Sequence, residues 1–285
     1  MSVVSAQTTT SAPVTGEKTK AASGRRVWIG VLLAVVGIGC VFWPPGFALL
    51  VEVVAIGALW ELGKLAQHKG VAIEFTVAAL AVTAYIALTY FGLIQRFEGD
   101  LLSLTIVAAM LSATFLSRGH QLMRSAFTLL GVLYIGKLLS YFVAIRMLDI
   151  GPIATLFVIV VIAMTDIGSM AIGVSIGRTP LTALSPNKTV EGALGGLVIA
   201  TAFAIGFALY MHWALYEGAL VGAITSFAAQ AGDLVESALK RDAKVKDAGT
   251  AIAGHGGVLD RFDSYLFGGI AFYFALVLIG RIPLG

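Results

Sequence analysis

The sequence predicts an all-α, polytopic integral membrane protein with about nine transmembrane helices and a cytoplasmic N-terminus. Of its 285 residues, 58% are apolar and only 12% are charged, and the mean hydropathy is +0.93. Apolar stretches long enough to cross a hydrocarbon core of about 30 Å recur along the chain. This composition excludes an ordinary soluble domain. The net charge of +3 reflects mainly the excess of Lys and Arg in the expected cytoplasmic connections, so it does not indicate a nucleic-acid partner.

The distribution of Lys and Arg sets the expected orientation, because these residues concentrate in cytoplasmic connections. The expected spans are 27–43, 46–63, 72–93, 101–117, 125–145, 152–175, 192–212, 217–238 and 264–280. With the N-terminus inside, only Arg96, Arg146 and Arg281 of the 19 Lys and Arg residues fall outside, and Lys137 lies within a span. The basic cytoplasmic face would also attract anionic membrane lipid.

The chain divides into three expected regions. Residues 1–26 are rich in Ser, Thr and Ala, lack the apolar core of a signal peptide, and are expected to form a disordered cytoplasmic tail. Residues 27–150 form about five N-terminal transmembrane helices with short connections and no obvious site. Residues 151–285 carry two longer polar connections, 176–191 and 239–263, on the same side of the membrane. Long polar connections are where functional residues usually lie, so these two could close over one site.

The second connection contains the densest polar stretch of the chain, "KDAGTAIAGHGGVLDRFD", residues 246–263. Its glycines allow the backbone to approach a ligand closely and to offer N–H groups to an oxyanion. Asp260 and Asp263 are spaced one helical turn apart. Three Asp, a Lys, an Arg and a His beside these glycines favour a binding site over a solvated loop.

Asp233 lies in an apolar helical pattern, with Ser237, Lys240 and Arg241 on the same face at i+4, i+7 and i+8. A charge within a span costs about 2.5–3.5 kcal/mol, so Asp233 needs a partner. One interpretation is a structural salt bridge, to Lys240 or to another helix. The other is that Asp233 and Asp260 hold Mg²⁺ while Lys and Arg side chains neutralise phosphates.

The first connection contains "SPNKTVEG", Ser185 to Gly192. Thr189 is expected to cap the helix that follows, and Glu191 lies where that span begins. Lys188 is either a phosphate contact or a positive-inside anchor. Asp166 opens the segment that leads into this connection and is expected near the site.

Other features of the spans have structural interpretations. Small residues spaced four apart, Gly173 with Gly177 and Gly192 with Gly196, would allow helices to pack closely. A structural pair between Glu52 and Lys137 is possible from the sequence but not determined by it.

Residues Ser237 to Ser264, "SALKRDAKVKDAGTAIAGHGGVLDRFDS", closely resemble the signature of phosphatidate cytidylyltransferases, the CDP-diacylglycerol synthases. The pattern is S-x-x-K-R, K-D-x-G and H-G-G-x-x-D-R-x-D. "DIGSMAIGVSIGR" and "SPNKTVEGALGG" also resemble family motifs. Two departures are Ala253, where the family usually has Pro, and Val190, where it often has an aromatic residue.

The resemblance implies a Mg²⁺-dependent reaction of CTP with phosphatidate that gives CDP-diacylglycerol and pyrophosphate, in a homodimer, with or without a second cation. It implies a bacterial inner-membrane protein whose active site faces the cytoplasm. Asp233 and Asp260 would be the metal ligands. The catalytic residues would be Asp233, Asp260, Lys240, Arg241, Lys246, Asp247, His255, Arg261 and Asp263. The substrate-binding residues would be Ser185, Lys188, Thr189, Glu191, Ser237, Gly256, Gly257 and Asp166.

Two alternatives remain open from the sequence. A cytidylyltransferase for another lipid phosphate, of the CDP-archaeol type, would have nearly the same catalytic connections. A membrane transporter is the alternative from a different class, because buried Asp and Lys residues are also typical of transport pathways.

Overall fold

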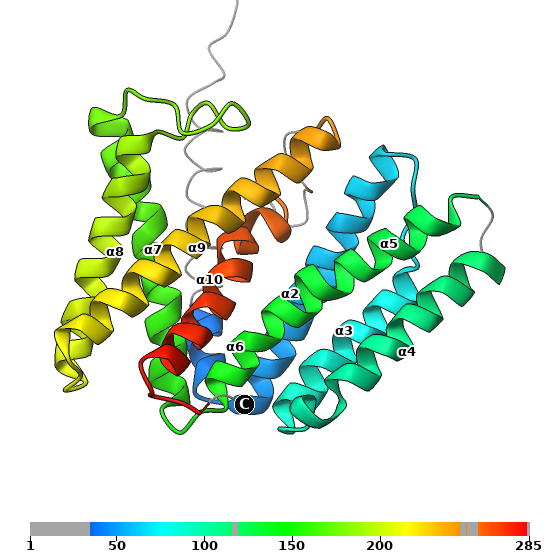
Figure 1. Ribbon diagram of the computed structural model, residues 1–285, viewed down its shortest axis with the longest axis horizontal. Helices are drawn as coiled ribbons and strands as arrows, with labels where there is room; N and C mark the ends of the chain where they lie inside the picture. Colours follow the sequence, from blue (N-terminus) through cyan, green and yellow to red (C-terminus); the bar gives the residue numbers. More distant parts are fainter. Residues whose placement is uncertain (1–34, 116–118, 246–248, 250–255, 284–285) are drawn as a thin grey trace, which may run out of the picture. The chain divides into compact units, whose positions relative to one another are not determined.

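The computed structural model describes residues 35–115, 119–245, 249 and 256–283. The expected tail and residues 27–34 of the first expected span, 27–43, lie outside the described residues. Residues 37–285 form one compact unit, and Figure 1 shows its helices. The helices are α2 (Pro44–His68), α3 (Phe75–Tyr90), α4 (Ile94–Phe115), α5 (Gln121–Gly131), η1 (Val132–Lys137), α6 (Leu138–Arg146), α7 (Gly151–Ile176), α8 (Val190–Tyr210), α9 (Leu215–Asp242) and α10 (Leu259–Leu278).

The prediction of a helical, polytopic membrane protein is confirmed. Seven helical stretches of the described chain are long and apolar enough to cross a membrane, with α5, η1 and α6 together forming one of them. In the described residues, extended pairing is limited to an isolated bridge between Pro180 and Thr189. The predicted number of nine spans and the orientation of the N-terminus stay predictions.

The predicted span 72–93 is shorter in the structure than expected. Helix α3 has 16 residues, which corresponds to about 24 Å of helix, less than a bilayer core of about 30 Å. Gly92, which follows the C-cap residue Phe91, adopts a positive φ of 69°, the left-handed conformation that commonly ends helices. The apolar run is therefore longer than the helix it forms.

Local sequence explains where several helices begin. Pro44 and Pro152 lie in the first turns of α2 and α7, where a missing N–H removes no helical hydrogen bond. The Thr189 hydroxyl accepts a hydrogen bond from the Gly192 N–H at 3.1 Å, so the predicted cap of α8 is confirmed.

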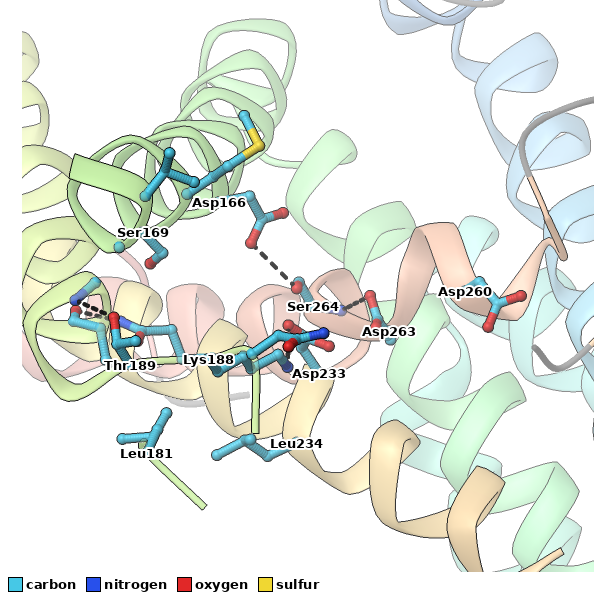
Figure 2. Close-up of a pocket in the computed structure, with 17 residues that line it drawn as sticks. Asp166, Ser169, Leu181, Lys188, Thr189, Asp233, Leu234, Asp260, Asp263 and Ser264 are labelled. Atoms are coloured by element: carbon cyan, nitrogen blue, oxygen red, sulfur yellow. Dashed lines mark hydrogen bonds and ion pairs between the residues drawn. The ribbon is translucent and has the colours of Figure 1, made fainter. Parts of the chain in front are cut away.

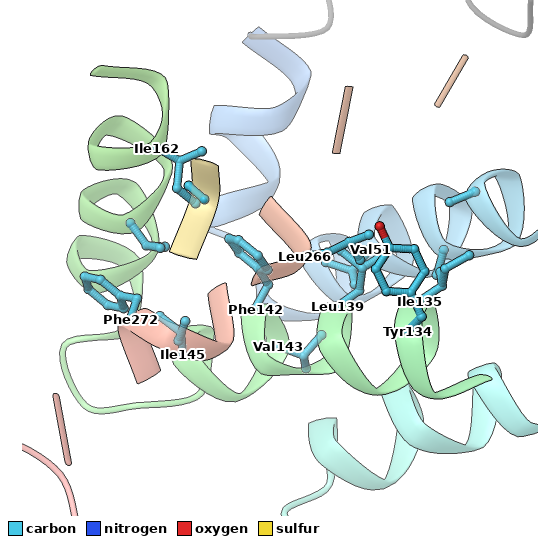
Figure 3. Packing of buried hydrophobic residues seen from close by; sticks show 14 of the residues in the cluster. Val51, Tyr134, Ile135, Leu139, Phe142, Val143, Ile145, Ile162, Leu266 and Phe272 are labelled. Carbon is cyan, nitrogen blue, oxygen red and sulfur yellow. The ribbon is translucent and has the colours of Figure 1, made fainter. Parts of the chain in front are cut away.

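Glycines allow the helices around the site to pack closely. Helix α8 packs against both α7 and α9, and α9 packs against α10. A Cβ at Gly196 would lie 2.6 Å from the Thr165 carbonyl oxygen, and one at Gly192 would lie 3.1 Å from the Gly173 Cα. The predicted close helix approach at these glycines is confirmed. On the other side of α10, the Phe142 ring lies against Gly269, within the apolar core that Figure 3 shows.

Two connections frame the site. The ends of the helices place them at residues 177–189 and 243–258, shorter than the expected 176–191 and 239–263. Helix α9 continues to Asp242 because Lys240 pairs with Glu236 one turn earlier, so the polar segment remains helical. Figure 1 shows the 177–189 connection and the C-terminal end of α9 at the same end of the helices.

Candidate active site

A cavity of about 590 Å³ lies among α7, α8, α9, α10 and the 177–189 connection. Its polar lining consists of Asp166, Ser169, Asn187, Lys188, Thr189, Gln230, Asp233, Asp260, Asp263 and Ser264, several of which Figure 2 labels. Met170, Val174, Leu181 and Leu234 line it with apolar side chains. The cavity therefore combines carboxylates, a cation and an apolar wall.

Asp233 forms an ion pair with Lys188 of the 177–189 connection. The interpretation in which Asp233 pairs with Lys240 is wrong. Lys240 lies seven residues further along α9, about 10.5 Å along the helix axis, and its ammonium contacts other carboxylates instead. Lys188 thus faces the cavity and a carboxylate, so it is more than a positive-inside anchor.

Three carboxyl groups face one another in the cavity. Asp263, 8% exposed, accepts a hydrogen bond from the Ser264 N–H at 2.7 Å, and its carboxyl lies beside the Asp233 carboxyl. Ser264 Oγ lies 3.5 Å from Asp166 Oδ1. Figure 2 shows Asp263 on the side of Asp233 and Lys188, with Asp260 nearer the start of α10. Such a concentration of negative charge requires cationic compensation.

These oxygen donors suit a hard divalent cation such as Mg²⁺. In the described residues, no three Asp, Glu, His or Cys side chains are arranged closely enough to hold a metal by themselves. Mg²⁺ commonly takes only one or two protein carboxylates and completes its coordination with water and phosphate oxygens. The chemistry of Asp233 and its neighbours therefore fits the ion, and the predicted Asp233 and Asp260 ligands stay a prediction.

A second polar network holds Asp260 in place. The Lys240 ammonium donates to Asp260 Oδ1 at 2.8 Å and also pairs with Glu236. The Gly257 N–H donates to Asp260 Oδ2 at 2.9 Å. The preceding Gly256 has a φ of 84°, a conformation that a side chain would strain. The two adjacent glycines thus allow the tight turn in which the backbone reaches the Asp260 carboxylate.

Glu236 is a functional candidate that the sequence reasoning missed. Its side chain is fully buried, and its carboxylate is beside the Lys240 ammonium. The i, i+4 spacing from Glu236 to Lys240 was a usable signal for this pair. Helical periodicity by itself groups Lys240 with Asp233 instead.

Hydrogen bonds within the 177–189 connection fix its shape. Glu191 accepts hydrogen bonds from the Arg178 and Thr179 N–H groups and from the Thr179 hydroxyl. The Leu181 N–H donates to the Lys188 carbonyl at 2.7 Å. Glu191 therefore serves to hold the connection, and Lys188 is presented from a braced segment.

The remaining predicted residues occupy different places. Arg241 is exposed and donates to the Leu184 carbonyl at 3.3 Å, which links α9 to the first connection. The Ser185 carbonyl accepts a hydrogen bond from the Lys188 N–H. Ser237 is half-buried on α9 and Arg261 is exposed on α10, and neither lines the cavity. The predicted residues Lys246, Asp247 and His255 lie outside the described residues.

The possible pairing of Glu52 with Lys137 is wrong. Lys137 forms its ion pair with Glu98 of α4. Glu52 accepts a hydrogen bond from the Thr83 hydroxyl at 2.5 Å. Both groups therefore have structural partners, and neither lines the cavity.

Comparison with known proteins gives a consistent result over most of the chain. The family model described as "Cytidylyltransferase family" matches residues 23–279. A phosphatidate cytidylyltransferase of Bacillus subtilis (strain 168) is 35% identical over 266 residues, covering 89% of this chain and 97% of the relative. The phosphatidate cytidylyltransferase of Helicobacter pylori (strain J99) is 34% identical, covering 84% of this chain and 83% of the relative. Phosphatidate cytidylyltransferase 4, chloroplastic, of Arabidopsis thaliana is 32% identical, covering 87% of this chain and 72% of the relative.

Proposed function

Because this chain belongs to the cytidylyltransferase family and is a nucleotidyltransferase enzyme, we propose that it joins CTP to phosphatidate, giving CDP-diacylglycerol and pyrophosphate. The observation that carries the proposal is the cavity in which Lys188, Asp233 and Asp263 meet beside an apolar wall. The relatives named above supply the substrate class.

The reaction requires little covalent chemistry from the protein. A phosphate oxygen of phosphatidate attacks the α-phosphorus of CTP, the bond from this phosphorus to the bridging oxygen breaks, and pyrophosphate leaves. The attacking group is already an anion, so no separate nucleophilic side chain is required. Positioning the substrates and neutralising their charge are the main tasks.

The cavity suits one polyanionic and one lipid substrate. Lys188 provides a cation at the wall formed by the first connection. Met170 and Val174 of α7 line the same cavity and are 66% and 84% exposed, so an apolar strip leads from it to the outer surface of the helix. We propose that acyl chains follow this strip into the bilayer while the phosphate stays beside Lys188.

We propose that Asp233 and Asp260, with Asp263 beside Asp233, hold Mg²⁺. When bound, the ion would supply positive charge that offsets the charge developing on the pyrophosphate leaving group. Lys240 is held by Glu236 and Asp260, so its first role is to position Asp260. Glu191 and Thr189 keep the Lys188 connection in shape.

The first test measures turnover of labelled CTP by purified protein in phosphatidate-containing micelles with Mg²⁺. We expect CDP-diacylglycerol from the wild type, and a loss of product with Asp233→Asn. Asp242→Asn is the matched control, because Asp242 lies at the end of the same helix, is exposed and lines no part of the cavity. A fully active Asp233→Asn enzyme would contradict the proposed role of this carboxylate.

The same assay separates the alternatives. Product with an isoprenoid-ether phosphate and none with phosphatidate would favour a CDP-archaeol type of cytidylyltransferase. No product with either, together with solute uptake into vesicles containing only this protein, would favour transport.

We also propose a bacterial cell membrane, a cavity that faces the cytoplasm and a homodimer. Bacterial relatives and the distribution of Lys and Arg support the first two. A Cys40→Ser background with a cysteine introduced at Asn187 would test sidedness by impermeant thiol labelling, since Cys40 is the single cysteine. The molar mass of the protein in detergent would test the dimer.

A further inference from the structure

Glu61 of α2 is a fully buried carboxylate that lies directly against the glycine-rich turn before α10. Its Oε2 accepts a hydrogen bond from the Leu259 N–H at 2.8 Å, across 198 residues of sequence. Leu259 is the first residue of α10, and Asp260 follows it. A residue of the N-terminal half, where the sequence shows no site, therefore contacts the turn at Gly256 and Gly257 that precedes Asp260.

The complete burial of Glu61 indicates that its contact with the turn has a specific role. An ionisable group removed from water is costly unless it is hydrogen-bonded or paired. Glu61 has no salt bridge within the described part of the chain, and its Oε1 has no hydrogen-bond donor there. Apolar packing alone would be served better by Leu or Met at this position. The polar group therefore has a use other than filling space.

The turn is shaped to accept Glu61. A Cβ at Gly257 would lie 2.8 Å from the Glu61 carboxyl carbon, and one at Gly249 would lie 2.6 Å from it. One turn earlier on α2, Gly57 leaves room for the Val258 side chain, whose Cγ2 lies 3.2 Å from the position of a Cβ. Glycines on both segments thus allow α2 and the turn to approach closely.

Resting on the proposed function, we propose that Glu61 is a positioning residue for the cytidylyl transfer. Glu61 fixes the start of α10 because its carboxylate accepts a hydrogen bond from the Leu259 N–H and occupies the space beside Gly257. Gly257 in turn donates its N–H to Asp260 Oδ2, and Lys240 donates to Oδ1. Glu61 therefore acts on the reaction through the placement of the Asp260 carboxylate and does not line the cavity itself.

The test compares Glu61→Ala and Glu61→Gln with the wild type, using Glu52→Gln as the matched control. Glu52 is also on α2, but its carboxylate accepts a hydrogen bond from the Thr83 hydroxyl and does not contact the turn. We expect kcat of Glu61→Ala, per folded enzyme, to fall by about 10- to 100-fold, with the KM for CTP changed less than about 3-fold, because a displaced supporting group impairs alignment. Glu61→Gln retains an acceptor oxygen, so we expect kcat within about 3-fold of the wild type.

Hydrogen–deuterium exchange supplies a readout that needs no activity. We expect amide exchange in a peptide covering residues 256–263 to accelerate by about 5- to 10-fold in Glu61→Ala and to stay unchanged in Glu52→Gln, as loss of one hydrogen bond would cause. If the wild type makes no CDP-diacylglycerol, the proposed function fails while the exchange result still tests the Glu61 contact.

A folded Glu61→Ala protein with wild-type kcat and wild-type exchange would overturn the proposal. So would a Glu61→Gln enzyme as inactive as Glu61→Ala with unchanged exchange, since charge rather than positioning would then be the cause. Should Glu61→Ala fail to fold, Gly257→Ala disturbs the same contact from the turn. Loss of kcat with faster exchange in Gly257→Ala supports the proposal, and wild-type values for both overturn it.

Discussion

Replacing Lys240 with Met removes a cation from between two carboxylates. The Lys240 side chain is 15% exposed, Asp260 is 12% exposed and Glu236 is fully buried. Removing one partner of a buried ion pair costs about 3–5 kcal/mol, because the other charge remains buried and uncompensated. The partial exposure of Lys240 and Asp260 places the expected loss at the lower end, about 3 kcal/mol.

The assay is thermal unfolding in detergent, followed by loss of the monodisperse folded species. A loss of about 3 kcal/mol corresponds to a fall in Tm of about 6 to 12 °C for a chain of this size. Lys69→Met is the matched control, because Lys69 pairs with Asp242 through side chains that are 39% and 66% exposed. Breaking that surface pair should cost less than about 1 kcal/mol.

A double variant separates the ion pair from other effects of the substitution. Glu236→Gln combined with Lys240→Met removes the buried charge, so we expect at least about 2 kcal/mol of the lost stability to return. If Lys240 also contacts substrate phosphate, activity should stay low in the double variant. An unchanged Tm in Lys240→Met, or a double variant no more stable than Lys240→Met, would refute this account of Lys240.

Three further predictions concern packing, capping and the metal. Gly196→Ala should lower the free energy of unfolding by about 1–3 kcal/mol, because its Cβ would clash with the Thr165 carbonyl oxygen. The control is Gly206→Ala on the same helix, whose Cβ would have no atom within 4 Å, so this variant should not destabilise the protein in the same unfolding assay. Thr189→Ala should cost about 1 kcal/mol by removing the cap of α8, and Thr189→Ser should restore it; equal Tm values for the two would contradict the cap. Chelation of divalent cations should abolish CDP-diacylglycerol formation and added Mg²⁺ should restore it, while full activity in excess chelator would exclude the proposed ion.

Much of the candidate site could be predicted from local sequence. The spacing of Asp260 and Asp263 predicts one helical turn between them, and both lie in the first turns of α10, although this helix begins earlier than the expected span 264–280. Thr189 was identified as a cap from its position before an apolar run, and its hydroxyl does cap α8. These inferences succeed because a helix cap and a helical spacing depend on residues only a few positions apart.

The partners of the charged residues could not be predicted in this way. Helical periodicity placed Lys240 on the same face as Asp233, but a face does not specify which group of another segment meets it. Lys188 lies 45 residues before Asp233 in the chain, and the packing of α8 against α9 brings their elements together. Lys240 instead forms ion pairs with Glu236 and Asp260.

The sequence by itself determined the helical membrane class and the family motifs, because apolar length and short motifs are properties of continuous segments. Only the tertiary structure decided that Asp263 lies beside Asp233 and that Glu61 reaches the turn before α10. Both contacts require helices to approach closely, which Gly232 and Gly257 allow because neither places a Cβ in the gap. A glycine in a sequence shows that close approach is possible, and the fold determines which group makes it.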